Sequence, residues 1–181
     1  MGAIGMNEFM SIPAGFQACD AMLKAASVEL AGAGCVCAGK YYIVVTGEVA
    51  AVRSSVEAGA EVAESLLVDS LVIANVDDSV GPAVSACTAV ETLQALGVME
   101  TYSLCAAIYA ADAAAKAAEV TLLEVRLGRG LGGKSFVLLT GEVAAVEAAV
   151  RAAEALEETN GLMAKSVVIP SPHPDMLRVV G

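Results

Sequence analysis

Aromatic residues are scarce in this chain: tryptophan is absent, and aromatic side chains make up 4% of the 181 residues. Basic residues are also few, with 10 Lys and Arg against 21 Asp and Glu, and the formal net charge is −11. Nucleic-acid binding requires Lys and Arg to neutralise phosphates. An anionic membrane surface likewise repels a chain of this charge. The composition therefore argues against both kinds of partner.

Long uncharged apolar runs are missing as well. The most hydrophobic stretch, residues 66–76, is interrupted by Asp69 and Ser70, whereas a membrane helix needs about 18 or more apolar residues in a row. No basic region followed by an apolar core marks a signal peptide at the N-terminus. Five cysteines, an odd number without the spacing of a small secreted domain, favour a reducing cytosol over a disulfide framework.

Small apolar residues are abundant instead. Hydrophobic residues make up 57% of the chain, mostly Ala, Val and Leu, which is more than a soluble monomer of this length needs. Small side chains let elements pack closely. The surplus therefore predicts extensive contacts between subunits.

The chain contains an internal duplication. Residues 3–28 align with residues 95–120 at an offset of 92, with 12 of 26 positions identical. Farther on, residues 46–52 match residues 140–146 without a difference, at an offset of 94. Self-similarity of this kind indicates two structural repeats. We expect the boundary near Glu91 to Gln94, giving domains at residues 1–91 and 92–181.

Each copy has the pattern of an α+β unit. The first copy predicts strands at residues 4–10, 28–35, 41–46 and 67–74, and helices at about residues 14–26 and 49–64. The order β-α-β-β-α-β is that of a ferredoxin-like unit. In the first helix of each copy a polar stripe lies on an apolar body. The stripe consists of Gln17, Asp20 and Lys24 in the first copy, and of Tyr109, Asp112 and Lys116 in the second.

Two glycine-rich bends join the middle strands. The first reads GAGCVCAGK (residues 32–40) and the second RGLGGK (residues 129–134), aligned on their shared Gly-Lys pair. Leu131 takes the place of Cys37, so only the first bend carries a thiol. The second bend is no phosphate-binding loop, because a strand follows it instead of a helix.

These sequences resemble bacterial microcompartment shell proteins with tandem BMC domains. The resemblance rests on DAMLKAA (residues 20–26), GMNE (residues 5–8) and IPSPH (residues 169–173), and it covers both copies. It is closest to the PduT type, the propanediol-utilisation shell protein that holds an iron–sulfur cluster. The resemblance implies a structural, non-enzymatic tile of a shell in the bacterial cytoplasm. It also implies a flat homotrimer that imitates a hexamer, with other shell proteins at its edges and a lumenal redox enzyme as a further partner.

The resemblance also implies roles for the bends, which would line the central axis of the trimer. Cys37 matches the cluster ligand of the PduT type, so that three thiolates would hold one [4Fe–4S] cluster, for electron transfer across the shell or for guarding a pore. The axis would be lined by Cys37, Ala38, Gly39, Leu131, Gly132 and Gly133. Cys35 has no counterpart among the ligands, and we expect it to pack. Cys19, Cys87 and Cys105 lie in Ala-rich segments and are expected to be buried.

Lateral contacts between discs are implied at a second set of residues. Lys24 and Lys116 match the family's edge lysine, each with an acidic partner four residues earlier, Asp20 and Asp112. His173 matches the C-terminal edge segment. Ser171 replaces the arginine of that segment, and the first copy has no such segment at all.

Two other functions fit parts of the sequence. A soluble ferredoxin-like redox protein would use Cys35 and Cys37 as a thiol pair, and a small-molecule sensor would bind effectors between ferredoxin-like repeats. No pairing of a nucleophile with a base is identifiable, which weakens an enzymatic function. Two-dimensional arrays would distinguish a tile from either alternative.

Overall fold

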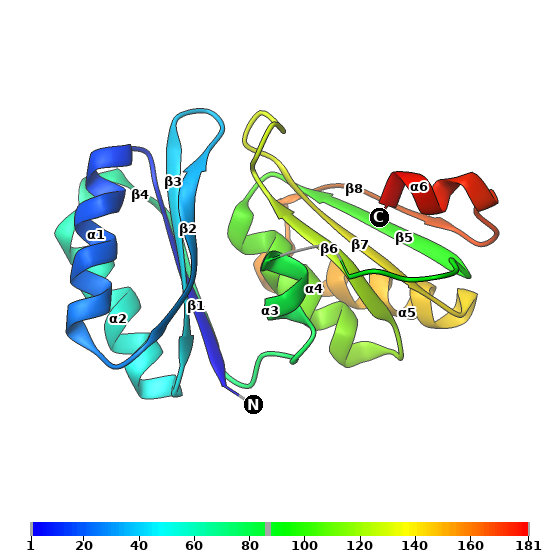
Figure 1. The fold of residues 1–181 in the computed structure, drawn as a ribbon, viewed down its shortest axis with the longest axis horizontal. Helices are drawn as coiled ribbons and strands as arrows, with labels where there is room; N and C mark the ends of the chain where they lie inside the picture. Colours follow the sequence, from blue (N-terminus) through cyan, green and yellow to red (C-terminus); the bar gives the residue numbers. More distant parts are fainter. Residues whose placement is uncertain (1, 86–87, 181) are drawn as a thin grey trace. The chain divides into compact units, whose positions relative to one another are not determined.

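The computed structural model describes residues 2–85 and 88–180, which form two compact units (Figure 1). The first unit comprises Met1–Val76 together with Arg129–Gly133. The second comprises Asp77–Gly128 and Lys134–Gly181. The bend of the second repeat thus belongs to the first unit by its contacts. Cys87 lies outside the described residues.

The first unit is a four-stranded antiparallel sheet with two helices on one face (Figure 1). Its strand order is β2-β3-β1-β4, the ferredoxin-like order, which confirms the fold predicted from the sequence. Its elements are β1 (Ala3–Phe9), α1 (Ile12–Ala25), β2 (Glu29–Val36), β3 (Lys40–Gly47), α2 (Val49–Val62), the 3-10 turn η1 (Glu64–Leu66) and β4 (Leu67–Ile73).

The second unit repeats this architecture with the strand order β6-β7-β5-β8 and adds elements at both ends. The added elements, α3 before the repeat and η3 with α6 after it, have no counterpart in the first unit. Its elements are α3 (Val80–Ser85), β5 (Ala95–Thr101), α4 (Leu104–Ala117), β6 (Thr121–Leu127), β7 (Ser135–Gly141), α5 (Val143–Ala155), η2 (Glu157–Thr159), β8 (Met163–Ile169), η3 (Pro174–Met176) and α6 (Leu177–Val180).

Local signals set where the first helix of each repeat begins. The Ser11 hydroxyl accepts a hydrogen bond from the Ala14 amide at 3.5 Å, and the Ser103 hydroxyl accepts one from the Ala106 amide at 3.3 Å. These caps satisfy amides that have no partner within the helix. Helix α1 therefore begins at Ile12, two residues earlier than the apolar pattern predicts.

The helices press closely onto the sheet in the first unit. A Cβ placed on Gly5 would come within 2.6 Å of the side chains of Val52 and Val56, so only glycine admits α2 at this distance from β1. The Asn7 amide nitrogen donates to the carbonyl oxygen of Val56 at 2.9 Å. Val52 and Val56 are buried, and Arg53 faces water. This rigid layer supports the strands that carry the first bend.

None of the helices in the described ranges is both long and apolar enough to cross a membrane.

Candidate axial and edge sites

The first bend is a tight connection between β2 and β3. Val36 pairs with Lys40, which leaves Cys37, Ala38 and Gly39 as the loop. The Gly39 amide donates to the Val36 carbonyl oxygen at 3.1 Å, and Gly39 has a φ of +80°, a conformation that favours glycine. The shape of the loop therefore comes from the hairpin and its glycine, and the Cys37 side chain is not needed to form it.

The thiols of this bend differ in environment. Cys35 is exposed, whereas Cys37 is half-buried, and both are free. Because β2 ends at Val36, Cys37 lies in the turn and does not continue the strand alternation from Cys35. The exposure of Cys35 also means that it does not pack into the core of its unit, contrary to our expectation.

The remaining described cysteines lie in helices. Cys105 is buried at 2% exposure, as expected, and Cys19 is half-buried against the core of the first unit. Burial, with the nearby Asp20 carboxylate, raises the pKa of the Cys19 thiol. A raised pKa keeps this thiol protonated, so it is a poor ligand and a poor nucleophile.

The second bend is longer. Leu127 pairs with Ser135, and residues 128–134 connect them, with four glycines at positive φ. A Cβ on Gly133 would lie 3.4 Å from the Cys37 carbonyl oxygen, so the two bends meet within the first unit. Neither Gly130 nor Gly132 has a neighbour within 4 Å of its Cβ position. The space around these two glycines is therefore open, close to the turn that carries the Cys37 thiol.

A repeated ion pair stands at the base of each bend. Lys40 Nζ lies 2.7 Å from Glu8 Oε1, and Lys134 Nζ lies 2.7 Å from Glu100 Oε1. The sequence shows that the same Glu and the same Lys occur at matching positions of the two copies, but it does not predict that the Glu and the Lys contact one another. Each pair ties the strand after the bend to the first strand of its own repeat.

Arg129 of the second bend lies beside the thiols of the first. Its guanidinium donates from Nη2 to the Tyr42 hydroxyl at 3.2 Å. Around it is an opening of about 410 Å³ lined by Cys35, Val36, Cys37, Ala38, Gly39, Arg129 and Gly130. Sequence reasoning missed Arg129, because a contact between two bends leaves no periodic signal.

The edge residues of the two repeats do not have equal environments. The Lys24–Asp20 pair, 2.6 Å long, is exposed at both ends. Asp112 is only 7% exposed: its Oδ2 accepts from Lys116 at 2.6 Å, and its Oδ1 accepts from the Asp77 amide at 2.8 Å. The polar stripe predicted for the second helix is thus partly covered, because the segment leading into α3 packs on α4.

The C-terminal edge residue His173 is exposed and local in its contacts. Its Nδ1 accepts a hydrogen bond from the Asp175 amide at 3.2 Å, which caps η3. The ring lies 3.5 Å from the Asp175 carboxylate. Among residues 2–85 and 88–180, no three Cys, His, Asp or Glu side chains come together as a metal site.

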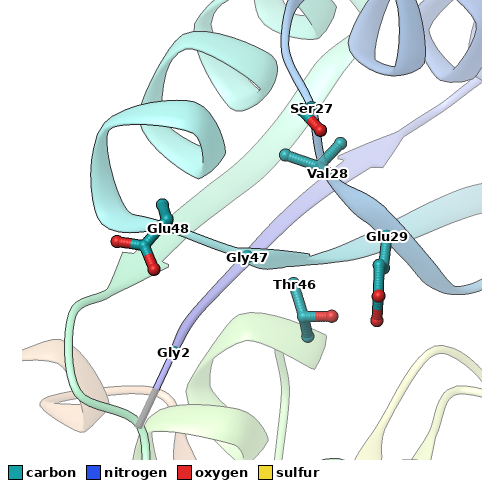
Figure 2. A pocket seen from close by; sticks show the side chains of 7 residues that line it. All are labelled: Gly2, Ser27, Val28, Glu29, Thr46, Gly47 and Glu48. Atoms are coloured by element: carbon teal, nitrogen blue, oxygen red, sulfur yellow. The ribbon is translucent and has the colours of Figure 1, made fainter.

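A further hollow lies at the opposite end of β2 and β3 from the bend (Figure 2). It has a volume of about 530 Å³, and the second repeat has a smaller hollow of about 300 Å³ at the matching strand ends. The carboxylates of Glu29 and Glu48 point in different directions in it (Figure 2). It is lined by Gly2, Ser27, Val28, Glu29, Thr46, Gly47 and Glu48.

Comparison with known proteins agrees with this architecture. The BMC domain family matches residues 3–76 and 95–172. The shell protein PduT of Citrobacter freundii is 43% identical over 176 residues, covering 97% of this chain and 96% of that one. The shell protein EutM of Salmonella typhimurium is 41% identical over 88 residues, covering 48% of this chain and 88% of that one.

A solved structure is similar along the whole chain. The crystal structure of a microcompartment protein from Desulfitobacterium hafniense DCB superposes with a TM-score of 0.92 at 48% identity, covering 98% of this chain and 99% of that one. The chain belongs to the bacterial microcompartment shell proteins with tandem BMC domains, which are structural, non-enzymatic components of a shell in the bacterial cytoplasm.

Proposed function

We propose that the chain forms a flat trimeric tile of the shell, and that the Cys37 thiolates of three chains hold one [4Fe–4S] cluster on the three-fold axis. The observation that carries this proposal is the asymmetry of the two bends. They share their Gly-Lys pair and their ion pair to the first strand, yet one bears Cys37 and the other Leu131. Three-fold symmetry turns a thiol present once per chain into a ring of three.

The residues at the first bend fit such a group. Thiolate is the ligand that iron–sulfur clusters use. Cys37 is a free thiol in a turn whose other two residues, Ala38 and Gly39, are small. A Cβ at Gly39 would meet nothing within 4 Å, so the space beside this turn is open. Within residues 2–85 and 88–180 no group of three such ligands comes together, which agrees with a centre shared among chains.

The remaining residues of the axis and edge have supporting roles. Gly39, Leu131, Gly132 and Gly133, with Ala38, line the axis beside Cys37. The ion pair between Lys40 and Glu8 fixes the strand that leaves the first bend. When bound, the cluster supplies one-electron redox chemistry, which suits exchange with a lumenal redox enzyme or control of a pore. Asp20, Lys24, Asp112, Lys116 and His173 contact neighbouring tiles. Along the sequence, the boundary between the two domains lies near Glu91 to Gln94.

The test is the iron and sulfide content of the anaerobically reconstituted protein, with its visible absorption and spin-resonance spectra. We expect about four irons per trimer in the wild type. Cys37→Ala removes the iron and leaves the trimer intact, because the hairpin and Gly39 form the loop without the thiol. Cys35→Ala is the matched control and retains the iron.

Two results would contradict the proposal. A wild type that takes up no iron ends the cluster hypothesis. Iron that survives Cys37→Ala but is lost in Cys35→Ala moves the ligand to the exposed cysteine.

A further inference from the structure

Arg129 is held at a fixed place beside the first bend. Its Nη2 donates to the hydroxyl of Tyr42, which is only 7% exposed and stands in β3 opposite Gly34. A Cβ on Gly34 would lie 3.4 Å from the same nitrogen, so the glycine makes room for the guanidinium. The ring of Tyr42 is fixed in the sheet, and its hydroxyl is therefore a fixed acceptor. This hydrogen bond restrains the guanidinium beside the first bend, although Arg129 is an exposed residue.

The positive charge of Arg129 lies in the same opening as the two thiols. Of the seven residues that line the opening, Arg129 is the one basic side chain, none is Asp or Glu, and Cys35 and Cys37 share the opening with it. No carboxylate of the described ranges forms an ion pair with Arg129, and neither bend contains Asp or Glu. In a chain of net charge −11 this is a local reversal of sign.

We infer that Arg129 is a positioning residue that places positive charge beside the Cys37 thiol and makes this opening select an anionic occupant. The inference adds to the proposed function. Its consequence for the cluster rests on that proposed function. A cube with thiolate ligands is anionic, and its reduced form carries one more negative charge than its oxidised form. A neighbouring cation stabilises the reduced form more, which raises the reduction potential.

The alternative is that Arg129 only ties the two bends together through its hydrogen bond. The two roles separate by substitution. Arg129→Gln keeps a donor for Tyr42 and removes the charge, whereas Tyr42→Phe keeps the charge and removes the anchor. Arg129→Lys restores the charge. Arg53→Gln, which removes an exposed cation from α2 of the same unit, is the control for net charge.

The first measurement needs no cluster. In the full-length, iron-free protein carrying Cys35→Ala, Cys37 is alkylated with iodoacetate or with iodoacetamide, and the modified peptide is quantified by mass spectrometry. In both reactions the thiolate sulfur bonds to the CH₂ carbon and iodide leaves. The ratio of the two rate constants therefore cancels the thiolate fraction and reports the attraction of the anionic reagent.

We expect Arg129→Gln to lower the iodoacetate-to-iodoacetamide ratio by a factor of about three, the effect of one charge a few ångströms away in water. Arg129→Lys has a ratio close to that of the wild type, Tyr42→Phe has a ratio between those of the wild type and Arg129→Gln, and Arg53→Gln leaves the ratio unchanged. A ratio that is unchanged in Arg129→Gln, or that falls equally in Arg53→Gln, overturns the inference.

The second measurement uses the iron-loaded protein in a Cys35-containing background. The midpoint potential, followed by spin resonance, is lower in Arg129→Gln than in wild type, while the iron content is equal. An equal midpoint overturns the inference for the cluster. A wild type without iron ends the proposed function, and the alkylation ratio of that same protein then decides the role of Arg129 by itself.

Discussion

Lys40 Nζ lies 2.7 Å from Glu8 Oε1, and the carboxylate of Glu8 is completely buried. The equivalent pair in the second repeat, Lys134 with Glu100, has the same length, but its side chains are 41% and 38% exposed. Within the described ranges the second oxygen of Glu8 finds no hydrogen-bond donor. One duplicated contact thus has two environments, and its energetic weight differs between them.

The first prediction concerns these two ion pairs. Lys40→Met strands a buried carboxylate and is expected to lower the free energy of unfolding by roughly 3 kcal/mol or more. Lys134→Met breaks a pair in contact with water and is expected to cost less than about 1 kcal/mol. Denaturant unfolding at one fixed chain concentration checks both values.

The matched control is the double variant Glu8→Gln with Lys40→Met, which removes the stranded charge and recovers part of the loss. Equal costs for Lys40→Met and Lys134→Met would contradict the assignment of different burial.

The second prediction concerns tiling. Reversing the charge at both Lys24 and Lys116, by Lys→Glu, is expected to abolish two-dimensional arrays while the trimer persists. Lys24 is exposed and its pair with Asp20 is worth only tenths of a kcal/mol, so its loss does not unfold the chain. Electron microscopy of sheets and light scattering of the soluble fraction provide the measurement.

Arg53→Glu, an equal change of charge on another exposed helix face, is the control and should still form sheets. Arrays that persist in the double lysine variant would remove these lysines from the edge. Lys116→Glu alone is expected to be less stable than Lys24→Glu, because its partner Asp112 is buried.

Much of the fold could be predicted from the sequence because the duplication supplies each pattern twice. Matching positions such as Gly5 and Gly97, or the capping residues Ser11 and Ser103, recur at one offset and mark the same places in both sheets. The elements, their order and the two repeats follow from that. The observed ends of helices and strands differ from the predicted ends by one or two residues, because helix caps and strand pairing set them.

Features that occur once were not predictable. The covering of Asp112 depends on α3, a short helix that precedes the second repeat and has no counterpart in the first. The hydrogen bond from Arg129 to Tyr42 joins residues 87 positions apart through two loops. Neither contact leaves a periodic pattern in the sequence, so the sequence alone predicts only part of the candidate site.

The third prediction concerns acid stability. Hydrogen bonds from the Ser79 hydroxyl at 2.6 Å and the Ser79 amide at 2.9 Å hold the pKa of Asp77 below its ordinary 3.8; burial opposes this shift, and Lys116 supports it. A depressed pKa in the folded state stabilises the fold above pH 3.8, and this contribution is lost as pH falls through the folded value. Ser79→Ala should therefore be less stable than wild type near neutrality, with the gap narrowing in acid.

The measurement is the free energy of unfolding at about pH 6 and about pH 3, on either side of the ordinary pKa of 3.8. Ser85→Ala is the control, because the Ser85 hydroxyl donates to the Gly81 carbonyl oxygen at 3.0 Å, and that acceptor does not titrate. Its cost should not vary with pH. Parallel curves for both variants would show that Asp77 is not the group responsible.

The last prediction concerns the trimer and follows from a difference between equivalent helices. Helix α4 is buried along its length within the chain, and Ile108 is 0% exposed. Phe16, at the same position of α1, is 60% exposed, and Leu23, about two helical turns later on α1, is 41% exposed. In a ring of six similar domains the equivalent faces have similar surroundings. A neighbouring subunit is therefore expected to cover α1.

We expect the chain to run as a trimer, at three times its mass of 18.2 kDa, with an apolar interface larger than roughly 1,600 Å². Phe16→Asp places a carboxylate in that interface and should shift the mass measured by light scattering toward the monomer at micromolar concentration. Gln17→Asp, the same charge one position along on the polar stripe, should remain a trimer. A wild-type monomer would contradict the assembly, whereas a trimer indifferent to Phe16→Asp would place its interface away from this face of α1.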